Sequence, residues 1–124
     1  MKRASQRQSG AATMVGATPP DLAGYLRPLI RSLLPEGYPG VLLVARLCGL
    51  PLRSFQRQLA RAGLTFSDLV EQVRLELAIS LMGNAAIQIT EVALELAYSD
   101  SANFTRAFRR WTGVPPQRYR QFRL

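Results

Sequence analysis

The sequence contains no histidine and a single cysteine, Cys48. A lone thiol cannot form a disulfide within the chain, and metal sites of the cysteine–histidine type need several such ligands, so both are excluded. Long hydrophobic runs are also missing, since no stretch approaches the roughly 18 apolar residues of a membrane span. The basic segment 1–17 has too short and broken an apolar part for a secretory signal. We therefore expect a cytoplasmic protein that uses no membrane, metal or cofactor.

Acidic residues are scarce, because eight of them stand against sixteen basic residues, and lysine occurs only once. The formal net charge is +8 in a chain of 124 residues, of which 48% are hydrophobic. A chain of this length can bury a core in one domain or in two very small ones. The excess of positive charge favours a polyanionic partner, nucleic acid before membrane.

Helical periodicity dominates the sequence, and no segment alternates as a strand would, so we predict an all-α fold. Residues 1–18 show no periodicity and are interpreted as a flexible arm or the remnant of a linker. Residues 19–124 form the predicted domain. Within it, start and stop signals predict seven helices, over about 21–34, 41–48, 52–61, 66–82, 89–96, 101–111 and 115–121.

Two segments of the sequence repeat each other, Val44–Leu59 and Val92–Phe108. Each begins with Val-Ala, and four residues after the alanine stands Gly49 in the first copy and Ala97 in the second. A polar turn and the pattern Phe-x-Arg-x-apolar follow, with one extra residue in the second turn. Small residues let two helices cross closely, and glycine accepts the positive φ of a turn. We predict two helix-turn-helix units, about 41–62 and 89–112, joined by one long central helix, about 66–82.

The segment Ile89–Arg120 reads ITEVALELAYSDSANFTRAFRRWTGVPPQRYR. It resembles the C-terminal signature of the AraC/XylS family of bacterial transcription regulators, and the resemblance extends over roughly residues 20–122. It implies a DNA-binding domain with two helix-turn-helix motifs, which recognises specific double-stranded sequences and regulates transcription. Family members commonly carry a sensing or dimerisation domain before this one. The chain is therefore interpreted either as a stand-alone small regulator or as a domain of a longer protein.

The sequence departs from the family pattern at three places. At one of them, Pro115 and Pro116 begin the last helix where a Ser/Thr-Pro pair is common, and proline is tolerated at the first helical position. Ala97 stands where the family usually has glycine, and an alanine with positive φ costs roughly 1 kcal/mol. Gln88 stands where a serine or threonine N-cap is usual, although Glu91 keeps half of a capping box. We expect a slightly strained or reshaped second turn and a weaker start of the helix at about 89.

The helices over 52–61 and 101–111 are the candidates for entering the major groove, which is wide enough to admit a helix. On the first, Phe55 and Leu59 are expected to face the core. The resemblance implies base-edge contacts for Arg53, Gln56 and Arg57, and arginine and glutamine suit guanine and adenine. Most outward residues of the second helix are small, so we expect it to hold the DNA backbone more than read bases. The predicted base contacts are Arg53, Ser54, Gln56, Arg57, Ser101, Ala102, Asn103, Thr105 and Arg106.

Other arginines are predicted to contact DNA phosphates: Arg61, Arg109, Arg110, Arg118, Arg120 and Arg123. Arg74 is instead expected to bond to neighbouring helix ends. Helical spacing predicts that the aromatic residues near the C-terminus pack in the core rather than stack on bases: Phe104, Phe108, Trp111 and Tyr119. Residues 67–96 hold five acids and one arginine, so this stretch is expected to lie off the DNA or to face another protein, such as RNA polymerase.

Three other functions fit the composition less well. A non-specific architectural DNA protein has no need for the base-edge chemistry of Arg53, Gln56 and Arg57. An enzyme, such as a recombinase or repair domain, would need clustered acids, a metal site or an activated cysteine, and no base stands near Cys48 in the sequence. A helical protein-interaction bundle would not need the net charge of +8 or two matched arginine-bearing helices.

Overall fold

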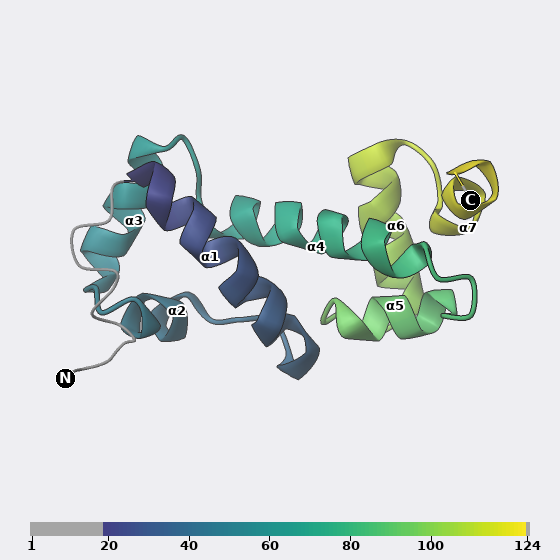
Figure 1. Cartoon of the computed structure of the whole chain (residues 1–124), viewed down its shortest axis with the longest axis horizontal. Helices are drawn as coiled ribbons and strands as arrows, with labels where there is room; N and C mark the ends of the chain where they lie inside the picture. Colours follow the sequence, from purple (N-terminus) through teal and green to yellow (C-terminus); the bar gives the residue numbers. More distant parts are fainter. Residues whose placement is uncertain (1–18, 124) are drawn as a thin grey trace. The chain divides into compact units, whose positions relative to one another are not determined.

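The computed structural model describes residues 19–123, and its regular elements are all helical (Figure 1). They are α1 (Pro19–Leu33), the 3-10 helix η2 (Leu34–Glu36), α2 (Val41–Leu47), α3 (Leu52–Arg61), α4 (Phe66–Met82), α5 (Ile89–Glu95), α6 (Ser101–Thr112) and α7 (Pro116–Arg123). The all-α prediction with seven α-helices is confirmed for this part of the chain, and every helix end lies within two residues of the predicted one. The predicted arm, residues 1–18, lies outside the described residues.

The described chain divides into two compact units. Unit 1 consists of the residues up to Ile30 together with Pro39–Val70, and unit 2 consists of Arg31–Tyr38 together with the residues from Glu71 onwards. Helices α1 and α4 therefore each contribute residues to both units. Unit 1 contains the helix pair α2–α3, and unit 2 contains the pair α5–α6, so each unit holds one of the two predicted helix-turn-helix motifs.

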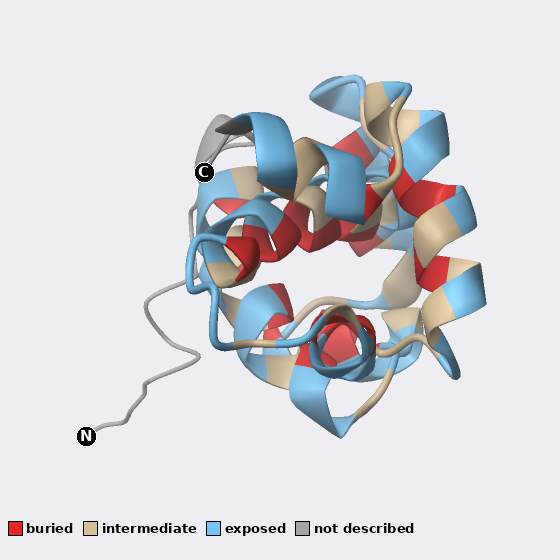
Figure 2. Cartoon of the chain, turned by 90° about the vertical axis from the view of Figure 1, so that its right-hand side faces the viewer, coloured by how far each residue is buried: buried red, intermediate tan, exposed pale blue. Residues whose placement is uncertain are grey.

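Apolar residues at helical spacing form the core of unit 1. The stripe of α1 recurs every four residues and is fully buried at Leu22, Leu26 and Ile30. Phe55 and Leu59 of α3 are also buried, as predicted, with 0% and 1% of their surface exposed. The ring of Phe55 lies 6.0 Å from that of Phe66, which is the first residue of α4. Figure 2 shows the same alternation of buried and exposed positions along the helices.

Aromatic rings form much of the core of unit 2. Phe104 and Phe108 of α6 are fully buried, with their ring centroids 5.7 Å apart. The ring of Tyr119 from α7 meets Phe108 edge-on at 5.3 Å, and Trp111 lies 6.4 Å from Phe108. The prediction of an aromatic core is confirmed for the two phenylalanines. Trp111 and Tyr119 are only half-buried, so they close the edge of this core.

Helix α4 begins at a capping box formed by Thr65 and Asp68, two residues whose spacing of three is typical of this motif. The amide of Asp68 donates to Thr65 Oγ1 at 3.1 Å, and the amide of Thr65 donates to Asp68 Oδ2 at 3.3 Å. Helical spacing predicts an apolar stripe on α4 made of Phe66, Leu69, Val70, Val73, Leu77 and Leu81. The four central residues of this stripe are buried, whereas Phe66 and Leu81 are half-buried and Ala78 and Met82 are buried in addition. A helix that contributes to two cores needs more than one apolar face.

Candidate nucleic-acid interface

The first turn lies between α2 and α3 and is centred on Gly49, whose φ is 71°. The amide of Leu50 donates to the carbonyl of Ala45 at 3.0 Å, which closes the end of α2. Ala45 itself is 2% exposed, so the alanine of the repeat lies in the core, as its small size suggests. Helix α3 begins three residues after Gly49, at Leu52.

The polar face of α3 is exposed because its apolar residues are committed to the core. Arg53, Gln56 and Arg57 are exposed, as is Arg61 in the last turn. Ser54 is half-buried, and its hydroxyl accepts a hydrogen bond from Arg57 Nη2 at 3.4 Å. The sequence-predicted base contacts of α3 therefore share one side of the helix, and three of the four are open to a ligand.

The second turn lies between α5 and α6 and follows the same pattern. Ala97 has φ of 70°, and the amide of Tyr98 donates to the carbonyl of Ala93 at 3.0 Å. Ala93 is fully buried, like its counterpart in the first copy. Helix α6 begins at Ser101, four residues after Ala97, which places the extra residue of the second copy in the turn.

Helix α5 begins after Gln88, and the contribution of Glu91 to the capping box that the sequence indicates is present. The amide of Gln88 donates to Glu91 Oε1 at 2.8 Å, which is the half of a capping box that Glu91 supplies. Gln88 has extended backbone angles, as an N-cap residue should.

Helix α6 begins with an N-cap that the sequence reasoning missed. The carboxylate Oδ1 of Asp100 accepts a hydrogen bond from the amide of Asn103 at 2.8 Å. The Ser-Asp pair immediately before the helix was the signal that could have identified it. The side chain of Asn103 donates to Ser99 Oγ at 3.0 Å and accepts from Arg106 Nη2. These contacts hold two predicted base-contacting residues against each other and against the turn.

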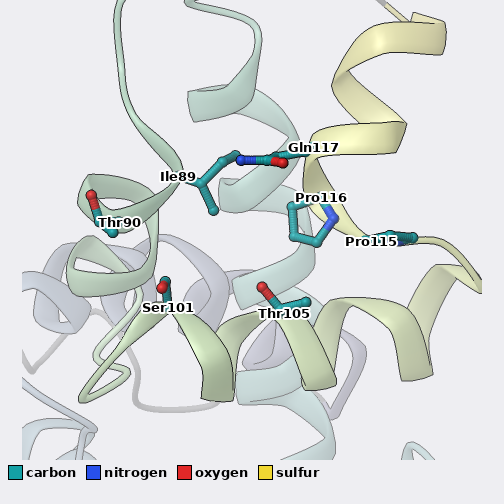
Figure 3. A pocket seen from close by; sticks show the side chains of 7 residues that line it. All are labelled: Ile89, Thr90, Ser101, Thr105, Pro115, Pro116 and Gln117. Atoms are coloured by element: carbon teal, nitrogen blue, oxygen red, sulfur yellow. The ribbon is translucent and has the colours of Figure 1, made fainter.

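The other predicted residues of α6 differ in exposure. Ala102 and Arg106 are exposed, whereas Ser101, Asn103 and Thr105 are half-buried. The small side chains leave a hollow beside the helix, of about 270 Å³ (Figure 3). It is lined by Ile89, Thr90, Ser101, Thr105, Pro115, Pro116 and Gln117.

The hollow adds two polar residues to the candidate interface, Thr90 at the start of α5 and Gln117 at the start of α7. The same two side chains line a second hollow of about 330 Å³, together with Gln88, Ile89 and Arg120. Sequence reasoning missed both residues because each is a single polar side chain outside the recognition helix. Only the packing of α5, α6 and α7 brings them beside Ser101 and Thr105.

The arginines predicted for phosphate contacts fall into two groups. Arg61, Arg109 and Arg118 are exposed. Arg110 forms an exposed ion pair with Glu71, at 3.2 Å between Nη2 and Oε2. Arg120 is half-buried and donates from Nε to the carbonyl of Met82 at 3.2 Å. Its guanidinium therefore caps the end of α4, which leaves less of it to meet a phosphate. The side chain of Arg123 lies outside the part of the chain that the structure describes.

Two side chains with reactive or charged groups, those of Arg74 and Cys48, are buried. Arg74 is 8% exposed, and its guanidinium donates to the carbonyls of Leu96 and Ala97 at the end of α5, which confirms the expected bonding to a neighbouring helix end. Cys48 is 3% exposed, and burial raises the pKa of its thiol to about 11. A thiol with that pKa stays neutral at physiological pH, so Cys48 packs as a small apolar side chain.

Residues 19–123 contain no group of three or more histidine, cysteine or acidic side chains placed to hold a metal ion. No helix in this range combines the length and the apolar character that a membrane crossing demands.

Comparison with known proteins places the two turns in a known family of domains. A helix-turn-helix domain model matches residues 44–121. The HTH-type transcriptional regulator VqsM of Pseudomonas aeruginosa is 36% identical over 87 residues, which make up 70% of this chain and 27% of VqsM. The crystal structure of the transcriptional regulator CdpR from Pseudomonas aeruginosa is 33% identical with a TM-score of 0.69, over 86% of this chain and 32% of CdpR.

A further solved structure is that of the DNA-binding domain of AdpA, a global transcriptional factor, in complex with a target DNA. It superposes with a TM-score of 0.67 at 19% identity, over 85% of this chain and 92% of that chain, and it shows the same fold. The chain spans less than a third of the length of the first curated relatives that it matches.

Proposed function

The chain belongs to the AraC-type helix-turn-helix family of transcription regulators, and from this premise we propose that α3 and α6 are the helices with which it contacts DNA. A domain of this family binds double-stranded DNA sequence-specifically and regulates transcription. The family is a class of DNA-binding regulators and not a class of enzymes.

The proposal that α3 and α6 contact DNA rests on the structural equivalence of the turns that precede them. Gly49 and Ala97 have φ values of 71° and 70°, and each turn is closed by a 3.0 Å hydrogen bond to the carbonyl of the buried alanine of its copy. In each unit the helix after the turn buries its apolar face and leaves its polar face exposed. A helix presented in this way can enter the major groove of B-DNA.

We assign the reading of bases mainly to α3. Arg53, Gln56 and Arg57 are exposed on one face, and their side chains suit guanine and adenine edges. Helix α6 offers Ala102 and Arg106 as exposed residues, with smaller groups beside them. It is suited to apolar contact with a thymine methyl group and to one arginine contact, so fewer bases are specified by unit 2.

The DNA backbone is assigned to the exposed arginines and to the polar residues beside α6. Arg61, Arg109 and Arg118 supply positive charge, and Thr90 and Gln117 supply hydrogen-bond donors at the hollow beside Ser101. Such contacts position the domain without specifying bases. Arg110 and Arg120 are secondary contributors, because Arg110 forms an ion pair with Glu71 and Arg120 donates a hydrogen bond to the carbonyl of Met82.

We also propose protein partners and a cellular location for the whole protein. Residues 67–96 hold five acidic residues and one arginine, and we propose that this stretch faces another protein, such as RNA polymerase. The relatives are more than three times as long as the matched segment, which supports a sensing or dimerisation domain as a second partner. The protein would act in the cytoplasm, where bacterial DNA lies.

The test is selection of bound DNA from random duplexes, followed by footprinting of the selected site. We expect two protected segments per monomer, about 10 bp apart on one face of the DNA. The presence of one helix-turn-helix motif in each unit supports the expectation of two segments. Protection of one short segment per monomer would reject the assignment of α6 as a second DNA-contacting helix. Selection that enriched no sequence would favour the architectural alternative.

A further inference from the structure

Arg74 of α4 lies almost completely inside unit 2, where it contacts the turn that precedes α6. Its Nε donates to the carbonyl of Leu96 at 2.9 Å, and its Nη2 donates to the carbonyl of Ala97 at 3.2 Å. These two carbonyls flank the backbone of Ala97, the residue with positive φ. The guanidinium therefore holds both sides of the strained position with one rigid, planar group.

Two tyrosine rings complete the environment of this guanidinium. Its carbon lies 4.0 Å from the ring centroid of Tyr98 and 4.9 Å from that of Tyr38. Both distances suit attraction between a cation and the face of an aromatic ring. Tyr98 directly follows Ala97, and Tyr38 comes shortly after η2, so three segments of unit 2 meet at one side chain. We name Arg74, Tyr38, Tyr98 and the two carbonyls the arginine clamp.

The arginine clamp contacts α6 through the ring of Tyr98, which packs against the apolar face of that helix. The ring of Tyr98 lies 5.9 Å from Phe104 and 6.5 Å from Trp111, both of which belong to α6. A shift of the turn would therefore move the ring against which α6 packs. Protein cores are densely packed, so such a shift changes the direction of the helix and is not absorbed locally.

We infer that Arg74 is a positioning residue for DNA recognition by unit 2. By holding Leu96 and Ala97, it allows alanine to occupy a turn position that favours glycine, and it fixes the direction in which α6 leaves the turn. Its two hydrogen bonds also neutralise the carbonyl end of α5, where a cation is favoured. This inference rests on the proposed function, in which α6 contacts DNA.

The experiment uses the selected duplex and two derivatives, in which the segment contacted by α3 or the segment contacted by α6 is scrambled. The discrimination ratio is the affinity for the selected duplex divided by that for each derivative, measured well below the melting temperature of every variant. Arg74→Lys keeps the charge but cannot bond both carbonyls in a fixed plane. We expect the ratio for the α6 segment to fall about tenfold, which corresponds to about 1.4 kcal/mol of binding free energy. The ratio for the α3 segment should be unchanged.

Arg31→Lys is the matched control. Arg31 is also an arginine of unit 2 that bonds to another helix, through Ser80 Oγ at 3.4 Å, but it is exposed and remote from the turn in sequence. We expect this variant to keep both ratios. If Arg74→Lys lowered both ratios equally, or neither, Arg74 would serve general packing only, and the inference would be overturned.

Two further variants keep the test decisive if Arg74→Lys does not fold. Tyr38→Leu removes one ring at a position that is 49% exposed and leaves both hydrogen bonds in place. We expect a smaller loss, again confined to the α6 segment, and recovery in Tyr38→Phe, which keeps the ring. Equal values for Tyr38→Leu and Tyr38→Phe would contradict the role of the clamp.

Failure of the proposed function has a different signature. If Arg106→Ala left the α6 segment of the selected site unchanged, the assignment of α6 as a DNA-contacting helix would fall, whatever the behaviour of Arg74. If Arg106→Ala changed that segment and Arg74→Lys did not, only the positioning role would be lost. The two conclusions are therefore tested separately.

Discussion

Ala97 has the same left-handed backbone conformation as Gly49, with φ of 70° against 71°. Among residues 19–123 it is the only residue other than glycine with positive φ. The side chain of an L-residue disfavours this region, so the second turn carries strain that the first does not. The strain that the sequence analysis predicted from one alanine is therefore present in the structure.

Replacing Ala97 by glycine should be neutral or slightly stabilising, because glycine removes the strain but makes the unfolded chain more flexible. The reverse change, Gly49→Ala, should destabilise the fold by about 1 kcal/mol. A methyl group at Gly49 would meet no atom within 4 Å, so the cost there is conformational and not steric. Thermal melting of both variants measures the difference.

Gly24→Ala is the control for this pair. Gly24 lies within α1, has ordinary helical geometry, and offers open space for a methyl group. Alanine should therefore stabilise the protein there, by up to about 1 kcal/mol. A clear loss of stability in Ala97→Gly would show that the second turn does not need positive φ at that residue.

Removal of the N-cap of α6 should destabilise unit 2. Asp100→Ala leaves the amide of Asn103 without its 2.8 Å partner, and loss of such a cap costs about 0.5–2 kcal/mol. Asp100→Asn removes the charge but keeps an oxygen that can cap the helix, so it should retain most of the stability. Denaturant unfolding compares the two, and equal losses in both variants would mean that the charge, and not the cap, matters.

Substitutions on α3 should change which sequences are bound. Arg53→Ala and Arg57→Ala should each cost about 1–3 kcal/mol for the preferred site and relax specificity at one position. Arg118→Ala should weaken binding to all sequences about equally, since a phosphate contact carries no base information. Repeating the selection with each variant provides the readout. An unchanged motif with Arg57→Ala would show that α3 is not the reading helix.

The Cys48 thiol should resist modification while the protein is folded. Its pKa is raised to about 11 by burial, so the reactive thiolate is rare at pH 8. The folded state binds the thiol proton more tightly than the unfolded state. The contribution of this thiol to the free energy of unfolding should therefore be constant below about pH 9 and should be lost between about pH 9 and pH 11. Labelling with a thiol reagent at pH 8 should be slow in buffer and fast in denaturant. Fast labelling of the folded protein would contradict this assignment.

The sequence by itself determined the helices and the two turns. Helical periodicity and capping residues are local signals, so the burial of Phe55 and Phe104, the capping box at Thr65 and the positive φ at Ala97 could be predicted from residues a few positions apart. The repeat added specificity, because the same small residues recur at the same spacing in both copies.

Tertiary structure alone decided which polar side chains remain exposed and which bind within the protein. Arg120 donates to Met82, 38 residues earlier, and Arg110 pairs with Glu71, 39 residues earlier. The rings around Arg74 come from segments far apart in the chain, although its bonding to a helix end was expected. Such contacts depend on how helices pack, and periodicity within one helix shows only which face is polar. Whether a polar side chain binds inside the protein or remains exposed is therefore decided by residues distant in sequence.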